Sequence, residues 1–438
     1  MKKLIALMLS GILIASLAAC GSGAAAPTAA PSQDSPAAAA PEEKIVITVL
    51  DSGSAQENDF ETETLPRLIS AKYPNVTVEA SKLPDDQYYT ALKTKIASGE
   101  APDMFRVAPK GAGSNSVITL AEAGYLAPIN ELGIVELAGA SGTDAFRVGS
   151  NVYTVSSGVS ILGTYVNMDM LKSLSLSIPT TWAEFLDVCQ KLKDGGIQPI
   201  VMGDKDMYVM QFGMYQLAAS KVYPKNPAYD DQLRTGETHF TDTGSWDTVL
   251  EMYDTLYKNG YIDSSSLGIS QQQSQQMFVD KQAAMTFDGS WSAPTLRGAD
   301  FELGYYPLPG NEGSEILCAS MAPGSNWAIY SGSKHIDACK NLLQYWFDGE
   351  SDLWKAYVDA DKAVVTYGYG SDRVDVLFQP FMELYNNDRA YYWCNQGWPA
   401  GVENEMLAKF SELIGGQNTT VPEITKAMQR KFEEMVAG

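Results

Sequence analysis

In the first part of the chain, hydrophobic residues recur at strand-like spacing in some segments and at helical spacing in others. Lys44 to Leu50 (KIVITVL) alternates and is rich in β-branched residues, which predicts a strand, and Val76 to Glu79 has the same character. The polar run Asp51 to Asp59 between them predicts a loop that opens a helix. Asp86 to Gly99 carries apolar residues at helical spacing and ends on a glycine suited to a left-handed cap. Pro102 to Phe105 then begins a third expected strand.

The clearest helix lies in the stretch IPTTWAEFLDVCQKLKDGG, which runs from Ile178 to Gly196. Thr181 and Glu184 have the spacing of a capping box, and the two glycines predict the end of the helix. Ile197 to Val201 is the expected returning strand. Strand, helix and strand with short links indicate an α/β fold, in which ligands bind at the carboxyl ends of the strands. One apolar stripe should face the core: Trp182, Phe185, Leu186, Cys189 and Leu192.

The first twenty residues have the order of a secretory signal. Lys2 and Lys3 precede an uncharged apolar run from Leu4 to Leu17, which is too short for a comfortable membrane span. The sequence Leu-Ala-Ala before Cys20 resembles the bacterial lipobox, which implies cleavage before Cys20 and attachment of diacylglycerol to its sulfur. Two acyl chains satisfy the requirement for stable membrane anchoring. The alternative is that Cys20 is only one more residue of a hydrophobic leader.

The next segment, residues 20–43, is expected to be a disordered tether. It consists mainly of Ala, Pro, Ser and Gly and has no aromatic residue, leucine, isoleucine or valine with which to build a core. A flexible chain of this length would keep the folded body within a few tens of ångströms of the membrane. We therefore expect residues 1–19 to be a signal peptide, and the protein to act at the outer face of the bacterial cell membrane.

Composition narrows the range of partners. The chain has 438 residues with 31 basic and 53 acidic side chains, a formal charge of −22 at pH 7, so nucleic acid and anionic lipid surfaces are unsuitable partners. About 395 residues follow the tether, which predicts two domains. Two histidines and the spacing of the cysteines fit no metal or redox motif, so we expect no metal and no cofactor. Cys189 is expected to be a buried apolar residue, whereas disulfide bonding among Cys318, Cys339 and Cys394 is left open.

One short stretch poses a specific question. In AAMTFDGSWSAP, residues 283–294, a strand-like apolar run leads directly into Asp288, Gly289 and Trp291. A large apolar ring beside a glycine turn either packs back into the core or faces something other than protein. The rest of the sequence has to distinguish the two interpretations.

Four stretches together resemble the family 1 extracellular solute-binding proteins of ABC importers, the group that contains maltose-binding protein. They are YPNVTVEASKLPDDQYYTALKTKIASGEAPDMFRV, YVNMDMLKSLSLSIPTTWAEFLDVCQKLKDGGIQPIV, FVDKQAAMTFDGSW followed by FELGYYPLPG, and GSNWAIYSGSKHIDACKNLLQYWF. They occur in the family's order, behind a lipobox, and the resemblance covers nearly all of residues 44–438.

The resemblance implies a two-lobed periplasmic-binding-protein-like α/β fold (type II) with a hinged cleft between the lobes. It implies that residues 44–153 and 309–340 form one lobe, and that residues 154–308 and 341–438 form the other. The chain would cross between lobes near residues 153–156, 303–308 and 330–350. A monomer of this kind captures a sugar or oligosaccharide by hinge closure and delivers it to the permease subunits of an ABC importer.

A neutral sugar offers hydroxyl groups and flat C–H patches, so its site needs polar side chains and aromatic faces. The resemblance implies that Trp291 on its GxW turn faces the cleft, with Asp288 as a neighbouring contact or as a cap of its own turn. Gln56 and Glu57 lie where relatives place polar ligand contacts, although a solvated loop is the alternative. Arg106 follows the PDMF strand, but Val107 and Ala108 replace the aromatic of maltose-binding protein, which argues against maltodextrin specificity.

Two tryptophans near the C-terminus lie where maltose-binding protein supplies a stacking ring. We favour Trp398 over Trp393 as the ligand contact and expect at least one of them to pack the loop onto the following helix. Asp204 and Tyr208 are further candidates at the cleft face of the second lobe. Trp327 is expected in the core. The run SQQQSQQMFVD, residues 270–280, is expected to be a helix with a polar face rather than a binding patch.

Two other function classes remain open from the sequence. A secreted glycosidase would also be rich in aromatic residues and would need two carboxylates about 5–10 Å apart. The sequence contains no GxSxG or HExxH motif, and we expect no catalytic residue and no enzymatic activity. A surface lipoprotein that binds or senses glycans without delivering them is the second alternative.

Overall fold

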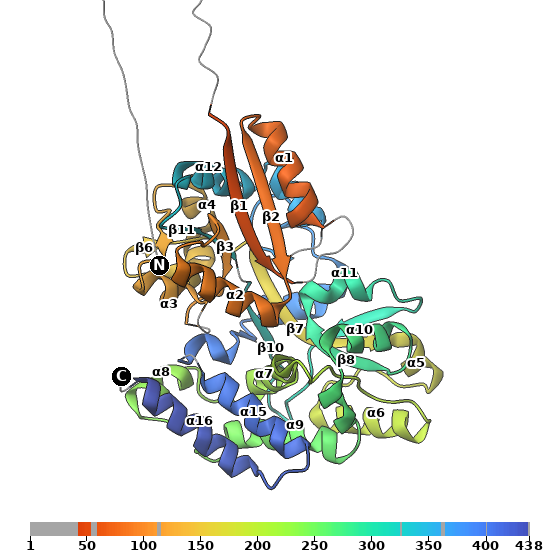
Figure 1. Ribbon diagram of the computed structural model, residues 1–438. Coiled ribbons are helices and arrows are strands. Elements are labelled where there is room, and N and C mark those ends of the chain that lie inside the picture. Colours follow the sequence, from red (N-terminus) through yellow and green to blue (C-terminus); the bar gives the residue numbers. More distant parts are fainter. Residues whose placement is uncertain are drawn as a thin grey trace, which may run out of the picture. The chain divides into compact units, whose positions relative to one another are not determined.

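Two large β-sheets organise the chain, and the computed structural model is drawn in Figure 1. It describes residues 43–53, 59–111, 115–324, 326–360, 364–399 and 401–436. The first sheet has the strand order β2-β1-β3-β11-β4. Its strands are β2 (Val76–Leu83), β1 (Ile45–Ser52), β3 (Met104–Val107), β11 (Asn326–Tyr330) and β4 (Leu126–Ala127).

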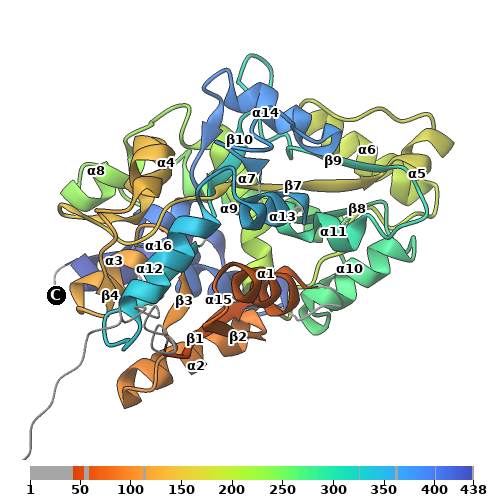
Figure 2. The same ribbon diagram turned by 90° about the horizontal axis from the view of Figure 1, so that it is seen from above.

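The first sheet is parallel at its centre and covered on both faces. Strands β2 and β3 both pair in parallel with β1, whereas β11 pairs antiparallel with β3. Ile47 and Val49 of β1 belong to one buried cluster and Leu50 to another, because successive side chains point to opposite faces. Helices α1 (Leu65–Lys72), α12 (Ile336–Trp346) and α13 (Asp352–Asp359) contribute to the first cluster. Helices α2 (Asp85–Ser98) and α3 (Val117–Glu122) contribute to the second, and Figure 2 shows α1 and α12 opposite α2.

The second sheet is built around the long strand β7 (Gly158–Asn167). Strands β8 (Met285–Gly289), β9 (Leu303–Tyr306), β10 (Ala319–Pro323) and β12 (Val364–Val365) all pair antiparallel with β7. Strand β13 (Ala390–Tyr391) extends the sheet beyond β10. Helix α7 (Met210–Lys221) is buried along nearly its whole length, so it lies at the centre of the core of this half.

The remaining elements flank the two sheets. They are β5 (Arg147–Val148), β6 (Asn151–Val152), α4 (Gly133–Thr143), α5 (Met168–Ser173), α6 (Trp182–Asp194), α8 (Tyr229–Thr235), α9 (Trp246–Lys258), α10 (Gln271–Val279), α11 (Ala293–Leu296), α14 (Gln379–Tyr385), α15 (Val402–Ile414) and α16 (Val421–Val436). Among the described residues, no helix is both long enough and apolar enough to cross a membrane.

The chain passes between the two sheets at places that differ in part from those expected. It passes first between β6 and β7, then between Pro323 of β10 and Asn326 of β11, and again between α13 and β12. The expected crossings at 303–308 and 330–350 are corrected, because β9 and β10 belong to one sheet and α12 packs in the core of the other. With these passages as limits, the strands among the described residues of 44–152 and 326–360 belong to the first sheet or the β5-β6 pair, and those of 158–323 and 364–436 belong to the second sheet.

Local predictions agree with the structure where the pattern is regular. The three expected strands correspond to β1, β2 and β3, and Gly99 caps α2 with a φ of 73°. Thr181 caps α6, but the Glu184 carboxylate accepts from the backbone and hydroxyl of Thr180 instead of closing a capping box. The strand expected at 197–201 is wrong, since only Ile200 forms isolated bridges there.

The cysteines are structural in the described part of the chain. Cys189 is fully buried, as expected for a small apolar residue, and burial raises the pKa of its thiol. Cys318, Cys339 and Cys394 are also buried and free, so none of them forms a disulfide in this structure. No group of three or more His, Cys, Asp and Glu side chains among the described residues could hold a metal ion.

Candidate functional site

The carboxyl edge of the first sheet carries a cluster of charged side chains. Asp51 is the penultimate residue of β1 and is 1% exposed, and Arg106 on the neighbouring strand β3 donates from Nη1 to Asp51 Oδ1 at 3.0 Å. The Arg106 guanidinium also lies over the ring of Trp327, with its central carbon 5.0 Å from the ring centroid. Burial lowers the pKa of Arg106, but the carboxylates of Asp51 and Glu61 raise it more, so the guanidinium stays charged. Arg106 is therefore fixed from two sides.

Lys82 on β2 completes this cluster. Its Nζ lies 2.7 Å from Asp59 Oδ2 and 3.3 Å from Glu61 Oε2. Asp59 also caps the short helix Phe60–Thr64 by accepting from two backbone N–H groups. Asp51, Lys82 and Arg106 thus lie at the carboxyl ends of three adjacent strands, at the edge where ligands of α/β proteins bind. Asp59 and Glu61 reach the same edge from the segment that follows β1. We call Asp51, Asp59, Glu61, Lys82 and Arg106 the charged edge.

The turn after β8 presents a partly exposed tryptophan. Trp291 is 40% exposed, and its ring contacts those of Phe212 and Trp393 edge-to-face at centroid distances of 5.7 and 5.8 Å. A Cβ atom added to Gly289 would lie 2.2 Å from the Trp291 ring, so only glycine leaves room for the ring at that place. The core interpretation of Trp291 is therefore wrong for the outer part of the ring, which remains accessible.

Asp288 organises this turn from within. It is 2% exposed and accepts hydrogen bonds from the backbone N–H of Gly289 at 2.7 Å and from Ser292 Oγ at 2.9 Å. Gln271 and Gln275 of α10 donate their side-chain amides to its two carboxylate oxygens at 3.0 and 2.8 Å. Burial raises the pKa of Asp288, and these hydrogen bonds oppose the rise. The expectation that Asp288 contacts the ligand directly is corrected, because the protein itself satisfies the carboxylate.

Helix α10 also contributes side chains that hydrogen-bond to the Trp291 turn. The expected helix exists and has a capping box at Ser270 and Gln273, but Gln271 and Gln275 face inward, one turn apart. Gln271 also accepts a hydrogen bond from the hydroxyl of Tyr208 at 2.6 Å. Sequence reasoning missed these two glutamines, although their i, i+4 spacing on one helix face was the available signal.

The loop after β3 lies close to the loop that carries Trp393. Lys110 Nζ lies 4.7 Å from the centroid of the Tyr392 ring, and a Cβ on Gly111 would lie 3.9 Å from the carbonyl oxygens of Gln396 and Trp398. Arg106 precedes the first of these loops, and Trp393 follows Tyr392 directly. In Figure 1 the arrowheads of β1 and β2 point toward the part of the molecule that contains β8, α10 and α11. We therefore treat the charged edge and the Trp291 turn as two faces of one candidate site.

Comparison with known proteins decides the family. Residues 59–351 match the sequence model described as bacterial extracellular solute-binding protein. The chain belongs to this family. It is 24% identical over 367 residues to the multiple sugar-binding protein of Streptococcus mutans serotype c, covering 82% of this chain and 83% of that protein. It is also 24% identical over 353 residues to the maltodextrin-binding protein MdxE of Bacillus subtilis (strain 168), covering 79% of this chain and 76% of that protein.

A solved structure supports the same fold. The structure titled chitin oligosaccharide binding protein superposes with a TM-score of 0.78 at 21% identity, covering 90% of this chain and all of that chain. This similarity establishes the fold alone. The two-lobed α/β fold of the type II solute-binding proteins, predicted from the resemblance, is confirmed.

The two C-terminal tryptophans of this solute-binding protein differ in burial. Trp398 is 1% exposed, donates from Nε1 to Asp230 Oδ1 at 3.1 Å and packs against Phe240 and Trp246. Trp393 is only half-buried and packs against Trp291. The preference for Trp398 as a ligand contact is corrected, because its ring lies in the core of the second lobe. Trp327 is fully buried, as expected.

Asp204 and Tyr208, which were both expected at the cleft face, lie in different surroundings. Asp204 is 1% exposed and accepts from the hydroxyl of Tyr257 at 2.8 Å, while burial raises its pKa to about 6. Its expected place at the ligand face is therefore corrected to a core position. Tyr208 is half-buried and contacts Phe212 edge-to-face at 6.0 Å, which keeps it next to the Trp291 cluster. Gln56, Glu57 and Cys20 lie outside the described residues, so their predicted roles stay predictions.

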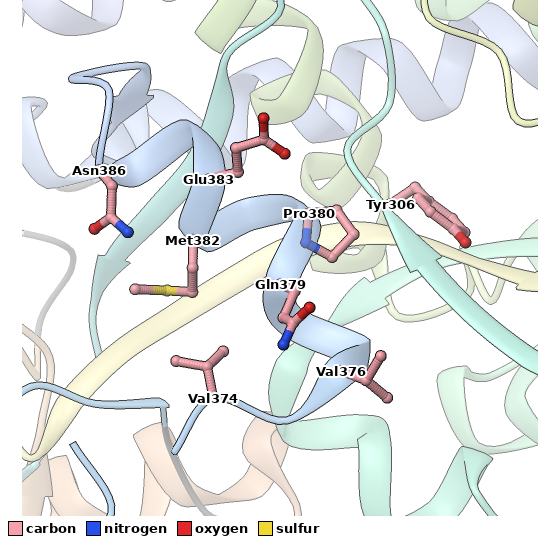
Figure 3. A pocket seen from close by; sticks show the side chains of 8 residues that line it. All are labelled: Tyr306, Val374, Val376, Gln379, Pro380, Met382, Glu383 and Asn386. Carbon is pink, nitrogen blue, oxygen red and sulfur yellow. The ribbon is translucent and has the colours of Figure 1, made fainter. Parts of the chain in front are cut away.

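A separate concave surface lies at β9 and α14 and is shown in Figure 3. Tyr306 of β9 flanks it, and the other side chains come from α14, its C-cap Asn386 and the segment that precedes the helix. None of the predicted ligand-binding residues lines this surface. The lining residues are Tyr306, Val374, Val376, Gln379, Pro380, Met382, Glu383 and Asn386.

Proposed function

We propose that this protein captures a sugar or oligosaccharide between its two lobes. The observation that carries the proposal is the Trp291 ring, which is 40% exposed although neighbouring rings hold it firmly in place. A fixed aromatic face covers the C–H patches of a sugar ring at little cost in conformational entropy. Trp291 is therefore the proposed stacking residue, with Trp393 and Tyr208 beside it.

Polar recognition is assigned to the opposite lobe. The Arg106 side chain is 26% exposed and uses Nη1 for Asp51, which leaves further N–H donors on the planar guanidinium for ligand hydroxyl oxygens. Gln56 and Glu57 are proposed as additional hydrogen-bonding groups on the loop after β1. An aromatic face and a fixed donor on different lobes would together favour closure around the ligand.

The wider role follows from the family. The proteins named in the comparisons are called a multiple sugar-binding protein, a maltodextrin-binding protein and a chitin oligosaccharide binding protein, which supports a saccharide ligand for this chain. We further propose that the protein is a monomer without enzymatic activity that delivers its ligand to the permease subunits of an ABC importer. Cys20 is the proposed lipid attachment point at the outer face of the cell membrane, and residues 21–43 are the proposed tether.

A thermal-shift screen tests the proposal. Ligand binding to the native state raises the melting temperature by mass action, so at least one mono- or oligosaccharide of a broad panel should raise it. The panel should contain maltotriose, raffinose, xylotriose and tri-N-acetylchitotriose, with amino acids and short peptides as comparison ligands. A shift with peptides alone, or no shift with any saccharide, would contradict the proposal.

A further inference from the structure

The concave surface at β9 and α14 has the size of a ligand site. Its volume is about 740 Å³, which lies within the range of about 300–1,000 Å³ in which proteins hold small molecules. None of its lining residues is buried, so the surface is open to solvent. It shares no lining residue with the Trp291 turn or with the charged edge. A ligand bound here would therefore meet a different set of side chains.

Helix α14 presents one stripe of side chains to this surface because its other face is packed. Phe381 contacts the buried ring of Tyr305 at a centroid distance of 4.7 Å. Phe378, directly before the helix, contacts the same ring at 6.1 Å. These contacts leave the opposite stripe of the helix facing outward. Its members, at positions i, i+3, i+4 and i+7, are Gln379, Met382, Glu383 and Asn386.

Three side chains of this stripe offer hydrogen-bonding groups that the protein does not use. Gln379, Glu383 and Asn386 are exposed, and none of these side chains has a hydrogen-bond or ion-pair partner among the described residues. The two amides both donate and accept, and the carboxylate accepts. The hydroxyl groups of a sugar have the same dual character. The lining contains no lysine or arginine, the side chains with which proteins pair phosphate or sulfate.

Tyr306 supplies an aromatic ring at the side of this surface. The ring packs over Gly304 of the same strand, where an added Cβ atom would lie 2.6 Å from Cε2 of the ring. The sulfur of Met168 lies 2.9 Å from the same position. Tyr306 is nevertheless only half-buried, and Figure 3 shows it across from Gln379 and Pro380. A ring held in this way covers the C–H face of a sugar at little cost in conformational entropy.

We infer that this surface is a second binding site, for a neutral saccharide chain. The inference goes beyond the proposed function and does not depend on capture between the lobes. Tyr306, Pro380 and Val376, which is 78% exposed, match the C–H patches of the chain, and the polar stripe of α14 matches its hydroxyl groups. Because the surface is open, it accepts an internal stretch of a polysaccharide as well as a free end.

Native affinity electrophoresis tests the inference. The protein is run through native gels that contain glycogen, arabinoxylan, galactomannan or glycol chitin, and through the same gel without polymer. We expect at least one of these neutral polysaccharides to slow the wild-type protein. The dependence of mobility on the polymer concentration gives the Kd for the polymer.

Variants of the surface locate the binding. Tyr306→Ala removes the ring and should weaken polymer binding about ten-fold or more. Tyr385→Ala is the matched control, because it removes a ring of α14 that is 39% exposed but does not line the surface, and it should bind the polymer as the wild-type protein does. The double variant Gln379→Ala/Asn386→Ala keeps both rings and should also weaken polymer binding several-fold. A thermal melt checks that each variant is folded.

Failure of this inference is distinguishable from failure of the proposed function. If no polysaccharide slows the wild-type protein, or if Tyr306→Ala and Tyr385→Ala have equal effects, the second site is overturned. Polymer binding that is lost in Trp291→Ala and kept in Tyr306→Ala would place the polymer in the cleft and would also overturn it. The thermal shift with trisaccharides tests the proposed function separately, and Tyr306→Ala should keep that shift.

Discussion

Gln275 donates a hydrogen bond from Nε2 to Asp288 Oδ2 at 2.8 Å, and this bond joins helix α10 to the turn that carries Trp291. The same amide lies 3.1 Å from Ser292 Oγ, on the other side of the tryptophan. The exposed ring is therefore positioned by a buried carboxylate and by a helix that precedes it in sequence. Sugar recognition at this turn should depend on residues that do not touch the sugar.

Replacing Gln275 by alanine should weaken sugar binding several-fold. The change leaves one oxygen of a buried carboxylate without its amide donor, which costs about 1–3 kcal/mol and loosens the turn. Calorimetric titration with the best saccharide measures the effect. Gln272→Ala, at an exposed position on the same helix, is the matched control and should bind as the wild-type protein does. Unchanged affinity in Gln275→Ala would show that the network does not position Trp291.

Gly289→Ala should displace the tryptophan ring without disturbing the backbone. Gly289 has a φ of −87°, which alanine adopts easily, but its Cβ would lie 2.2 Å from the Trp291 ring. We expect the affinity for the saccharide to fall about ten-fold or more and the tryptophan fluorescence spectrum to change.

Gly268→Ala serves as the control for Gly289→Ala. A Cβ at Gly268 meets nothing within 4 Å, so this variant should keep both the affinity and the spectrum of the wild-type protein. If Gly289→Ala also binds normally, the close approach of ring and backbone has no functional role.

Substitution of Trp398 should lower stability, whereas substitution of Trp393 should weaken saccharide binding. Trp398→Phe removes the N–H group that donates to the half-buried carboxylate of Asp230, so the free energy of unfolding should fall by about 1–3 kcal/mol. Its saccharide affinity should remain within about two-fold of wild type. Trp393→Ala should instead weaken binding, because it removes a ring that supports Trp291. Denaturant unfolding and calorimetric titration of both variants check this assignment, and the reverse pattern would restore Trp398 as the ligand contact.

Asp204 should lower the free energy of unfolding as the pH rises, which is the opposite of the usual effect of a carboxyl group. Burial raises its pKa from 3.8 to about 6, so the folded protein holds this proton more tightly than the unfolded chain does. The contribution of Asp204 to stability therefore falls as the pH rises from about 4 to about 6. Asp204→Asn should resemble the wild-type protein near pH 4 and be more stable by up to roughly 3 kcal/mol above about pH 6.5. Melting curves across this range test the sign, and a constant difference at all pH values would contradict it.

Local periodicity was sufficient to predict most of the regular elements. The alternation in β1 and the helical spacing in α6 are properties of consecutive residues, and both elements occur at the expected places. The strand expected at 197–201 failed because strand formation needs a partner along its length, and only Ile200 found one. The predicted positions at which the chain crosses between the two sheets differ from the structure for a related reason. These positions depend on which distant strands pair with β7.

The candidate site was only partly predictable for a similar reason. Trp393 and Trp398 occupy one irregular loop, and nothing in their immediate sequence shows which ring faces the core. Asp230, which bonds to Trp398, lies far away in the sequence. The inward direction of Gln271 and Gln275 became clear only with Asp288 in place between them.

The central claim is that Trp291 forms a saccharide-binding surface between the lobes. The most direct measurement is a calorimetric titration of the wild-type protein and Trp291→Ala with the saccharide that gives the largest thermal shift, together with a thermal melt of each protein. We predict that Trp291→Ala binds at least about 30-fold more weakly, because a lost stacking ring removes a large apolar contact. Its melting temperature without ligand should change little, because the ring is 40% exposed. Equal affinity of the two proteins, or unfolding of the variant, would contradict the claim.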